Sequence, residues 1–262
     1  MQEKNVKEEI FMLQSEGLRL RVYMAIPQVG SKPFPSVQIH HAGGGYEAIY
    51  EHMARLLAER GIVGVAMIHR GYPGSDGEME YGKGEIIDIG NLTEAMRARP
   101  FVDPDRMGIM GYSRGGHNAI LSIERFNYFK AGALWSTPVD MLELVRVVPW
   151  IAEIIGGFPD QIPEEYHIRS SINFVDQVSC PLLLIHGEND EIVSVNHARR
   201  LAEALEAHAK PFEIKIFPGE WHTWSMSGFG NNWKITMDFF ERHLKQPSSK
   251  ERIVDLPFFI FV

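Results

Sequence analysis

Short apolar runs alternate along the chain with longer segments whose apolar residues recur at helical spacing. Such runs are typical of buried strands, and such segments are typical of amphipathic helices. Strands with their following loops are predicted within residues 11–27 (a pair), 36–45, 62–77, 107–110, 131–140, 181–190 and 212–224. Helices are predicted within residues 50–61, 84–100, 117–121, 196–209 and 233–244. Apolar strands separated by helices indicate a mostly parallel sheet covered on both faces, so the predicted fold class is α/β.

One long segment, residues 138–178, breaks this alternation. It begins with a helical pattern and is then interrupted by Pro149, Pro159 and Pro163. A connection of this length is usually functional or disordered, and its many apolar residues argue against disorder. We therefore predict a cap inserted into a single discontinuous core domain made of residues 1–137 and 179–247.

The end of the chain, residues 248–262, becomes apolar after a polar stretch and reads IVDLPFFIFV. Such a tail would promote aggregation if it were exposed. We expect it to pack on its own domain or on a partner subunit, and the second arrangement predicts a homodimer.

Composition excludes several classes of function. The formal net charge of −8 and the pI near 5.8 argue against a nucleic-acid partner, because phosphate binding needs a basic face. A single cysteine, Cys180, excludes an internal disulfide and a zinc site built from cysteines, and its apolar neighbours predict a buried structural thiol. No apolar run approaches the roughly 20 residues that span a membrane, and the charged start does not resemble a secretory signal. We expect a cytoplasmic protein.

The stretch from Gly111 to Gly115, GYSRG, matches the G-x-S-x-G pattern of a nucleophile elbow. An apolar strand precedes it and a helix follows it, which is the context that the motif requires. In such an elbow Ser113 stands at the apex of a sharp turn. The turn crowds the positions two residues before and two residues after the serine, so both must hold small residues. The start of the helix also directs free N–H groups toward developing negative charge. Ser113 is therefore the candidate nucleophile.

A serine nucleophile needs a base, and the chain offers 11 histidines. His222 follows the last predicted strand, which is where the chain order serine, acid, histidine places it. His117 shares the helix of the serine, so we expect it to point into the packing. Three other histidines fall on predicted helices and are expected to be solvated: His197, His208 and His243.

The third member of such a triad is an acid that orients the imidazole ring. Asp190 follows the strand LLLIHG and precedes a helix, at the edge of an open sheet where catalytic groups gather. Its neighbours Glu188 and Glu191 are weaker candidates. The sequence thus predicts Ser113, Asp190 and His222 as a catalytic triad.

Acyl transfer also needs hydrogen-bond donors for an oxyanion. The backbone N–H of Arg114, the residue after the nucleophile, should be one donor. The glycine-rich run HHAGGG, residues 40–45, should supply the other from its backbone. The run lacks the features of a phosphate or dinucleotide loop. Hydrolysis through an acyl-enzyme on Ser113 is expected to use neither a metal nor an organic cofactor.

These motifs together resemble α/β-hydrolases of the prolyl-oligopeptidase-like and dienelactone-hydrolase-like branch. The resemblance rests on HHAGGG, HRGYPGSDG, GYSRGG, LLLIHGENDEIV and FPGEWHTW, and it extends from about residue 10 to 245. It implies the same triad and implies Gly43 as the second oxyanion donor. The usual His-Gly-Gly-Pro of the family reads His-Ala-Gly-Gly here, so Ala42 and Gly44 remain alternatives. Dienelactone hydrolases use cysteine as nucleophile, and Ser113 argues against that activity.

The predicted function is a serine hydrolase, with a carboxylesterase acting on small or medium acyl esters as the first expectation. The alternative is a peptidase acting on short peptides or amides, for which the cap residues Glu164 and Glu165 are the visible candidates to bind an α-amino group. A third hypothesis is a non-catalytic binding protein, because fold alone does not prove chemistry.

Aromatic residues near these motifs are the candidates to line the substrate pocket: Tyr112, Trp135, Trp150, Phe158, Tyr166, Trp221 and Trp224. The loop RGYPGSDG is expected to border the pocket, and its charged residues Arg70 and Asp76 are expected to fix the loop.

Overall fold

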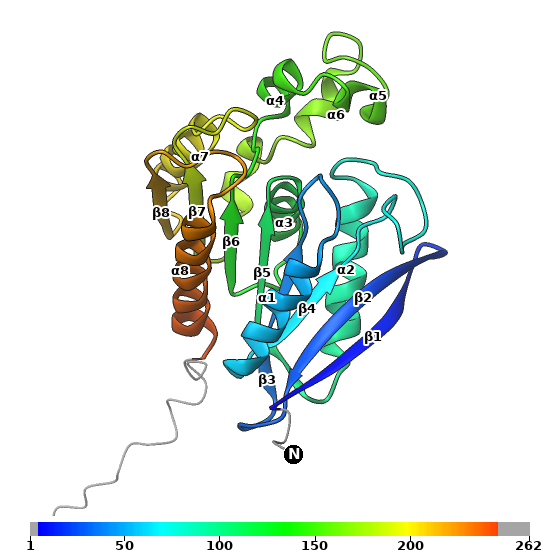
Figure 1. Cartoon of the computed structure of the whole chain (residues 1–262). Helices are drawn as coiled ribbons and strands as arrows, with labels where there is room; N and C mark the ends of the chain where they lie inside the picture. Colours follow the sequence, from blue (N-terminus) through cyan, green and yellow to red (C-terminus); the bar gives the residue numbers. More distant parts are fainter. Residues whose placement is uncertain (1–4, 246–262) are drawn as a thin grey trace, which may run out of the picture.

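A computed structural model describes residues 5–245, and its centre is an eight-stranded sheet in the order β1-β2-β4-β3-β5-β6-β7-β8 (Figure 1). The strands are β1 (Val6–Ser15), β2 (Leu18–Pro27), β3 (Phe34–His40), β4 (Val63–Met67), β5 (Val102–Tyr112), β6 (Ala131–Trp135), β7 (Leu182–Gly187) and β8 (Phe212–Phe217). The β1–β2 and β2–β4 pairs are antiparallel, and all other pairs are parallel. This arrangement is an α/β-hydrolase fold, which confirms the predicted fold class.

Helices cover both faces of the sheet, as the alternating pattern predicts. Helices α1 (Ala48–Glu59) and α8 (Met226–Leu244) pack against one face. Helices α2 (Gly84–Arg97), α3 (Arg114–Arg125) and α7 (Asn196–Ala207) pack against the other. Helix α8 starts well before the predicted Trp233, because the Ser225 side chain caps it by accepting from the N–H of Gly228 (3.0 Å).

Residues 138–178 are more helical than predicted. They form α4 (Met141–Val147), α5 (Ile151–Ile155), α6 (Pro163–His167) and two 3₁₀ turns, Ser171–Asn173 and Val175–Gln177. Figure 1 shows α4, α5 and α6 together above the carboxyl ends of the strands. They have their own apolar cluster, which also includes Tyr81 and Val193 from outside the segment. The division into core and cap stays a prediction.

Two expectations about charged loop residues are confirmed, and one about a histidine is wrong. Arg70 pairs with the buried Asp88 (2.7 Å), and Asp76 pairs with Arg19 (3.0 Å), so both fix the loop. His197 is 1% exposed rather than solvated, because it lies on the inner side of α7 and accepts from the N–H of Val139.

Other expectations lie partly outside the described residues. Cys180 is buried as predicted, and burial raises its thiol pKa to about 12.

The apolar tail, residues 248–262, falls outside residues 5–245, so the homodimer stays a prediction. Between residues 5 and 245, none of the helices combines the length and hydropathy needed to cross a bilayer.

Candidate active site

Ser113 stands at the apex of a sharp turn between β5 and α3. Its backbone has φ 53° and ψ −118°, a conformation that is rare for a residue with a side chain. A Cβ on Gly111 would overlap the backbone of Gly115, and a Cβ on Gly115 would overlap the carbonyl of His40. The glycines therefore allow the chain to turn tightly enough to hold the serine above the end of the sheet.

The structure brings Ser113, His222 and Asp190 together in one hydrogen-bonded row, although they are far apart in the sequence. The Nε2 atom of His222 lies 3.0 Å from the Oγ of Ser113, and its Nδ1 lies 2.8 Å from an Asp190 carboxylate oxygen. The row lies at the carboxyl ends of β5, β7 and β8, where the three following loops meet. This geometry can transfer a proton from the hydroxyl to the imidazole ring.

The Asp190 carboxylate is held by four donors, which fixes its orientation. One oxygen accepts from the N–H groups of Ile192 (3.1 Å) and Val193 (2.8 Å). The other carboxylate oxygen faces Nδ1 of His222 and Nε2 of His186 (3.2 Å). The same Nε2 atom of His186 also contacts the Val193 carbonyl. Burial raises the pKa of Asp190, but hydrogen bonds from His186 and His222 outweigh it and hold that pKa well below its ordinary value. The carboxylate therefore stays ionised beside the imidazole.

A second contact positions the His222 loop. The hydroxyl of Tyr112, the residue before the nucleophile, donates a hydrogen bond to the carbonyl of His222. The two rings lie with their centroids 5.5 Å apart. The elbow thus holds the backbone of the histidine as well as presenting the serine.

The loop after β3 approaches the serine with its peptide groups oriented by neighbouring side chains. The N–H of Ala42 donates to the hydroxyl of Tyr50 (3.0 Å), so it is not free to bind an oxyanion. The Ala42 carbonyl accepts from Nδ1 of His41 (2.8 Å) and from the N–H of Gly45 (3.1 Å). In a trans peptide the next N–H points the opposite way, so these bonds also orient the N–H of Gly43.

Three stacked histidines support this loop, and sequence reasoning did not find this role. His41 Nε2 accepts from the N–H of His69 (3.1 Å), and His69 Nε2 lies 3.0 Å from Nδ1 of His40. Burial lowers the pKa of His41 to about 4 and that of His40 to about 3, and lowers the pKa of His69 as well. The stack is therefore a neutral hydrogen-bonded scaffold.

The side chain of Arg114 connects α2 to the same loop. Its guanidinium pairs with Glu85 and donates to the hydroxyl of Tyr72 (2.8 Å), which donates in turn to the Gly43 carbonyl (2.8 Å). Burial acts to raise the pKa of Glu85, but Arg114 and three backbone N–H groups lower it overall. Sequence reasoning missed this connection, and the tyrosine in HRGYPGSDG was the available signal. The loop therefore supports the site through Tyr72 from behind.

Ser113 and His222 line a cavity of about 390 Å³ beneath α4 and α5, and Asp190 lies beside it. Its walls include the predicted Gly43, Tyr112, Ser113, Arg114, Trp150 and His222. Apolar side chains of the predicted cap complete it: Leu144, Val148 and Trp150. The Asp190 side chain lies behind His222 and does not line it.

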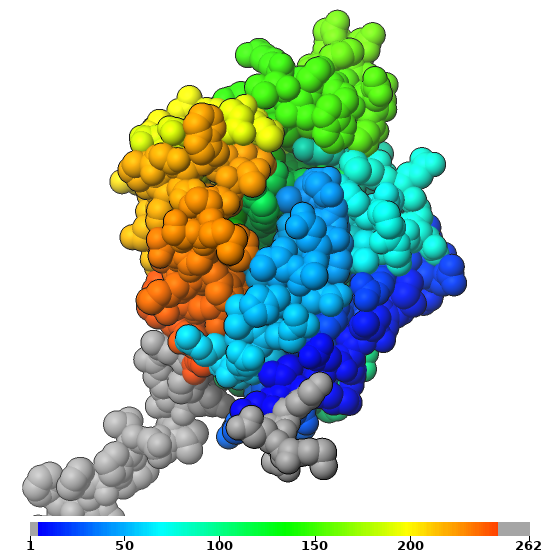
Figure 2. Space-filling view, in the orientation of Figure 1, coloured from blue at the N-terminus to red at the C-terminus, as the bar shows by residue number. Residues whose placement is uncertain are grey.

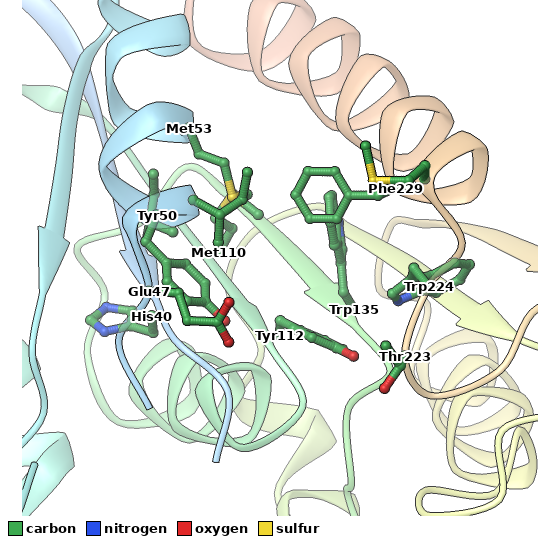
Figure 3. Close-up of a pocket in the computed structure, with 13 residues that line it drawn as sticks. His40, Glu47, Tyr50, Met53, Met110, Tyr112, Trp135, Thr223, Trp224 and Phe229 are labelled. Carbon is green, nitrogen blue, oxygen red and sulfur yellow. The ribbon is translucent and has the colours of Figure 1, made fainter. Parts of the chain in front are cut away.

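The remaining aromatic candidates divide into two groups. Trp135 and Trp224 line a second, neighbouring cavity together with Tyr112 (Figure 3). The prediction that Tyr166, Phe158 and Trp221 line the pocket is wrong. Tyr166 is fully buried among the cap helices, where its hydroxyl donates to the Gly157 carbonyl, whereas about half of Phe158 and of Trp221 is exposed to solvent.

The acidic pair considered for amine binding does not reach either cavity. Glu164 is exposed, and Glu165 forms an ion pair with Arg169 on the same helical stretch. Within residues 5–245, no group of three or more histidine, cysteine, aspartate or glutamate side chains is arranged to hold a metal ion.

Comparison with known proteins agrees with this geometry. The prolyl oligopeptidase family model matches residues 49–247, which is more than half of the chain. The chain is 30% identical over 207 residues to the uncharacterized peptidase YtmA of Bacillus subtilis, covering 76% of this chain and 79% of that protein. It is 26% identical to dipeptidyl-peptidase 5 of Porphyromonas endodontalis, covering 82% of this chain.

The likeness extends to solved structures. An acylaminoacyl peptidase from Pyrococcus horikoshii superposes with a TM-score of 0.83 at 25% identity over 97% of this chain. The present chain spans only 45% of that structure and 34% of the Porphyromonas enzyme, so it matches one part of each. The fold, the hydrogen-bonded row and the family match agree: the chain belongs to the prolyl oligopeptidase family and is a serine hydrolase.

Proposed function

We propose that the protein is a serine peptidase that cleaves amide bonds in short peptides or amino-acid amides. The observation that carries this proposal is the row Ser113–His222–Asp190 beside a cavity, in a chain of the prolyl oligopeptidase family. The names of the relatives support a peptidase more than the carboxylesterase that the sequence placed first. A binding protein without catalysis has no support from the intact row.

In the proposed mechanism Ser113 attacks the substrate carbonyl while His222 takes its proton. The ionised Asp190 accepts from Nδ1–H of His222, which keeps Nε2 free to act as the base and stabilises the charged ring. The ring then gives its proton to the leaving nitrogen, and water, activated in the same way, releases the acyl group from Ser113. No other group has to accept or supply a proton.

We propose the backbone N–H groups of Arg114 and Gly43 as donors to the oxyanion. The first lies at the start of α3, where the helix leaves N–H groups without intrahelical acceptors. The second is favoured over Ala42, whose N–H already donates to Tyr50. Such donors are most effective when they are held in place before the reaction begins.

We also propose that residues 138–178 act as a cap. Its residues Leu144, Val148 and Trp150 form an apolar wall of the cavity that contains Ser113. A substrate side chain next to the scissile bond would contact this wall. The cap would then favour apolar groups at that position.

The position of Gly43 gives a prediction for Tyr72→Phe. Removing the hydroxyl frees the Gly43 carbonyl, so the Gly43–Gly44 peptide, which directly follows the proposed donor N–H of Gly43, should become less well held. We expect kcat to fall about tenfold with little change in KM, which corresponds to one hydrogen bond. Steady-state kinetics would measure the split. Tyr23→Phe, which removes a hydroxyl on β2 that donates to Glu8 on β1, is the control and should leave kcat unchanged.

The proposed function is tested by comparing amino-acid and dipeptide p-nitroanilides with p-nitrophenyl esters of increasing chain length. A serine peptidase should hydrolyse at least one anilide and react with a fluorophosphonate probe. Turnover confined to the esters would support the carboxylesterase instead. If neither substrate class were cleaved and no label were incorporated, the chain would have the fold without the activity.

A further inference from the structure

A second cavity of about 310 Å³ lies between α1 and α8, on the face of the sheet opposite α3 (Figure 3). Figure 2 shows the surface hollowed between these two helices, which are light blue and orange. Apolar side chains form most of its walls: Ile39, Ile49, Met53, Met110, Trp135 and Phe229. Its volume is sufficient for one large apolar side chain, and the proposed mechanism does not use it.

This cavity is a neighbour of the catalytic cavity rather than a separate hollow. Glu47, Tyr112 and Thr223 line both cavities. Tyr112 directly precedes Ser113, and Thr223 directly follows His222. The two cavities therefore share a boundary beside the proposed catalytic residues, and an extended substrate at Ser113 would reach the second cavity by crossing it.

Glu47 and Trp224 are two of the polar residues that line the second cavity. Of the described residues that line either cavity, Glu47 is the one that carries a carboxylate. Its residue is exposed to solvent, and within residues 5–245 its side chain has no hydrogen bond or ion pair. The indole N–H of Trp224 is buried and has no acceptor in the same part of the chain. In Figure 3 the Glu47 carboxylate lies among the labelled side chains, and the nitrogen end of Trp224 points toward Trp135 and Thr223. One group can bind a cation, and the other can donate to a carbonyl oxygen.

We propose that the cavity between α1 and α8 is a subsite for an apolar amino-terminal residue, whose protonated amino group pairs with Glu47. The apolar walls take the side chain, Glu47 takes the ammonium group, and Trp224 donates to a backbone carbonyl of the substrate. This assignment rests on the proposed peptidase function. It also replaces Glu164 and Glu165, which reach neither cavity, with a carboxylate that lines both.

The first test removes the charge of Glu47. For leucyl-alanyl p-nitroanilide and its N-acetylated form, the ratio of kcat/KM values measures the preference for a free amino group. Glu47→Gln should lower that ratio about tenfold or more, the effect of one charge-assisted hydrogen bond. In the wild type the ratio should also fall as the pH rises through about 8, where an α-amino group loses its proton, and Glu47→Gln should flatten this dependence. Glu59→Gln, which removes an exposed carboxylate at the far end of α1, is the matched control.

The second test fills the cavity. Ile49→Trp introduces a large side chain from a partly exposed position on α1, and should raise KM for leucyl-alanyl p-nitroanilide while glycyl-alanyl p-nitroanilide is affected less. His52→Trp makes the same kind of change at an exposed position of α1 outside both cavities and should leave both KM values unchanged.

The outcomes separate the two proposals. An unchanged preference for the free amino group in Glu47→Gln, in an enzyme that cleaves these anilides, would overturn the subsite and leave the peptidase function standing. Equal effects of Ile49→Trp on the leucyl and glycyl substrates would also overturn it. A wild-type protein that cleaves none of the anilides would overturn the peptidase function, and with it the peptide subsite.

Discussion

Ser113→Ala is expected to lower kcat/KM by more than about 10⁴-fold on any substrate that the protein hydrolyses. The hydroxyl is the attacking group in the proposed mechanism, and its Oγ lies 3.0 Å from the base. Only the oxyanion donors and substrate binding would remain, and these give modest residual rates in serine hydrolases. The fold should be preserved, because alanine keeps the Cβ that the turn already accommodates at φ 53°. Fluorophosphonate labelling and steady-state kinetics, with a thermal melt to check folding, would measure the effect.

Ser136→Ala is a closely matched control for this prediction. Ser136 also has a positive φ, of 45°, and follows β6, the strand next to β5. Its hydroxyl is buried and has no partner within the described residues, and it does not line either cavity. Activity should therefore survive this change. Loss of turnover in Ser136→Ala but not in Ser113→Ala would contradict the assignment of the nucleophile.

Asp190→Asn should lower kcat by about 10⁴-fold while leaving the protein folded. The N–H groups of Ile192 and Val193 require an acceptor, so they should select the side-chain oxygen of the asparagine. The amide NH₂ group must then face Nδ1 of His222. The ring would have to accept there, which moves its proton to Nε2 and removes the base that Ser113 needs. The effect should therefore appear in kcat and change KM little.

The control for this prediction is Glu188→Gln, in the same loop. Glu188 is exposed and lies 3.6 Å from Arg199, a surface pair of small energetic value. Stopped or steady-state assays should give wild-type kcat for Glu188→Gln. Near-wild-type kcat in Asp190→Asn would mean that another group orients His222.

The sequence alone was sufficient for the fold class and for the residues of the row. Periodicity identifies strands and helices because each element must bury its own apolar side, and the alternation of the two leaves few topologies. The turn around Ser113 is also a local property, since Gly111 and Gly115 are needed within two residues of it. Asp190 and His222 could be selected because parallel strands end at one edge of the sheet, so the loops after β7 and β8 must lie near the loop after β5.

Other features depended on contacts between segments that are distant in sequence. The direction of an aromatic side chain in a loop is not fixed by its neighbours: Trp221 turns outward beside the buried His222, and Tyr166 turns into the cap helices. The burial of His197 and the unpartnered position of Glu47 likewise follow from which helix packs against which strand.

The sequence therefore determined the fold class and the candidate catalytic residues, because these follow from periodicity, local turn geometry and chain order. The tertiary structure decided which side chains line the two cavities, which loop holds Gly43 and which carboxylate lies at the boundary between the cavities. These choices arise from packing across the sheet and between loops, where many arrangements satisfy the same local pattern and only the assembled core selects one.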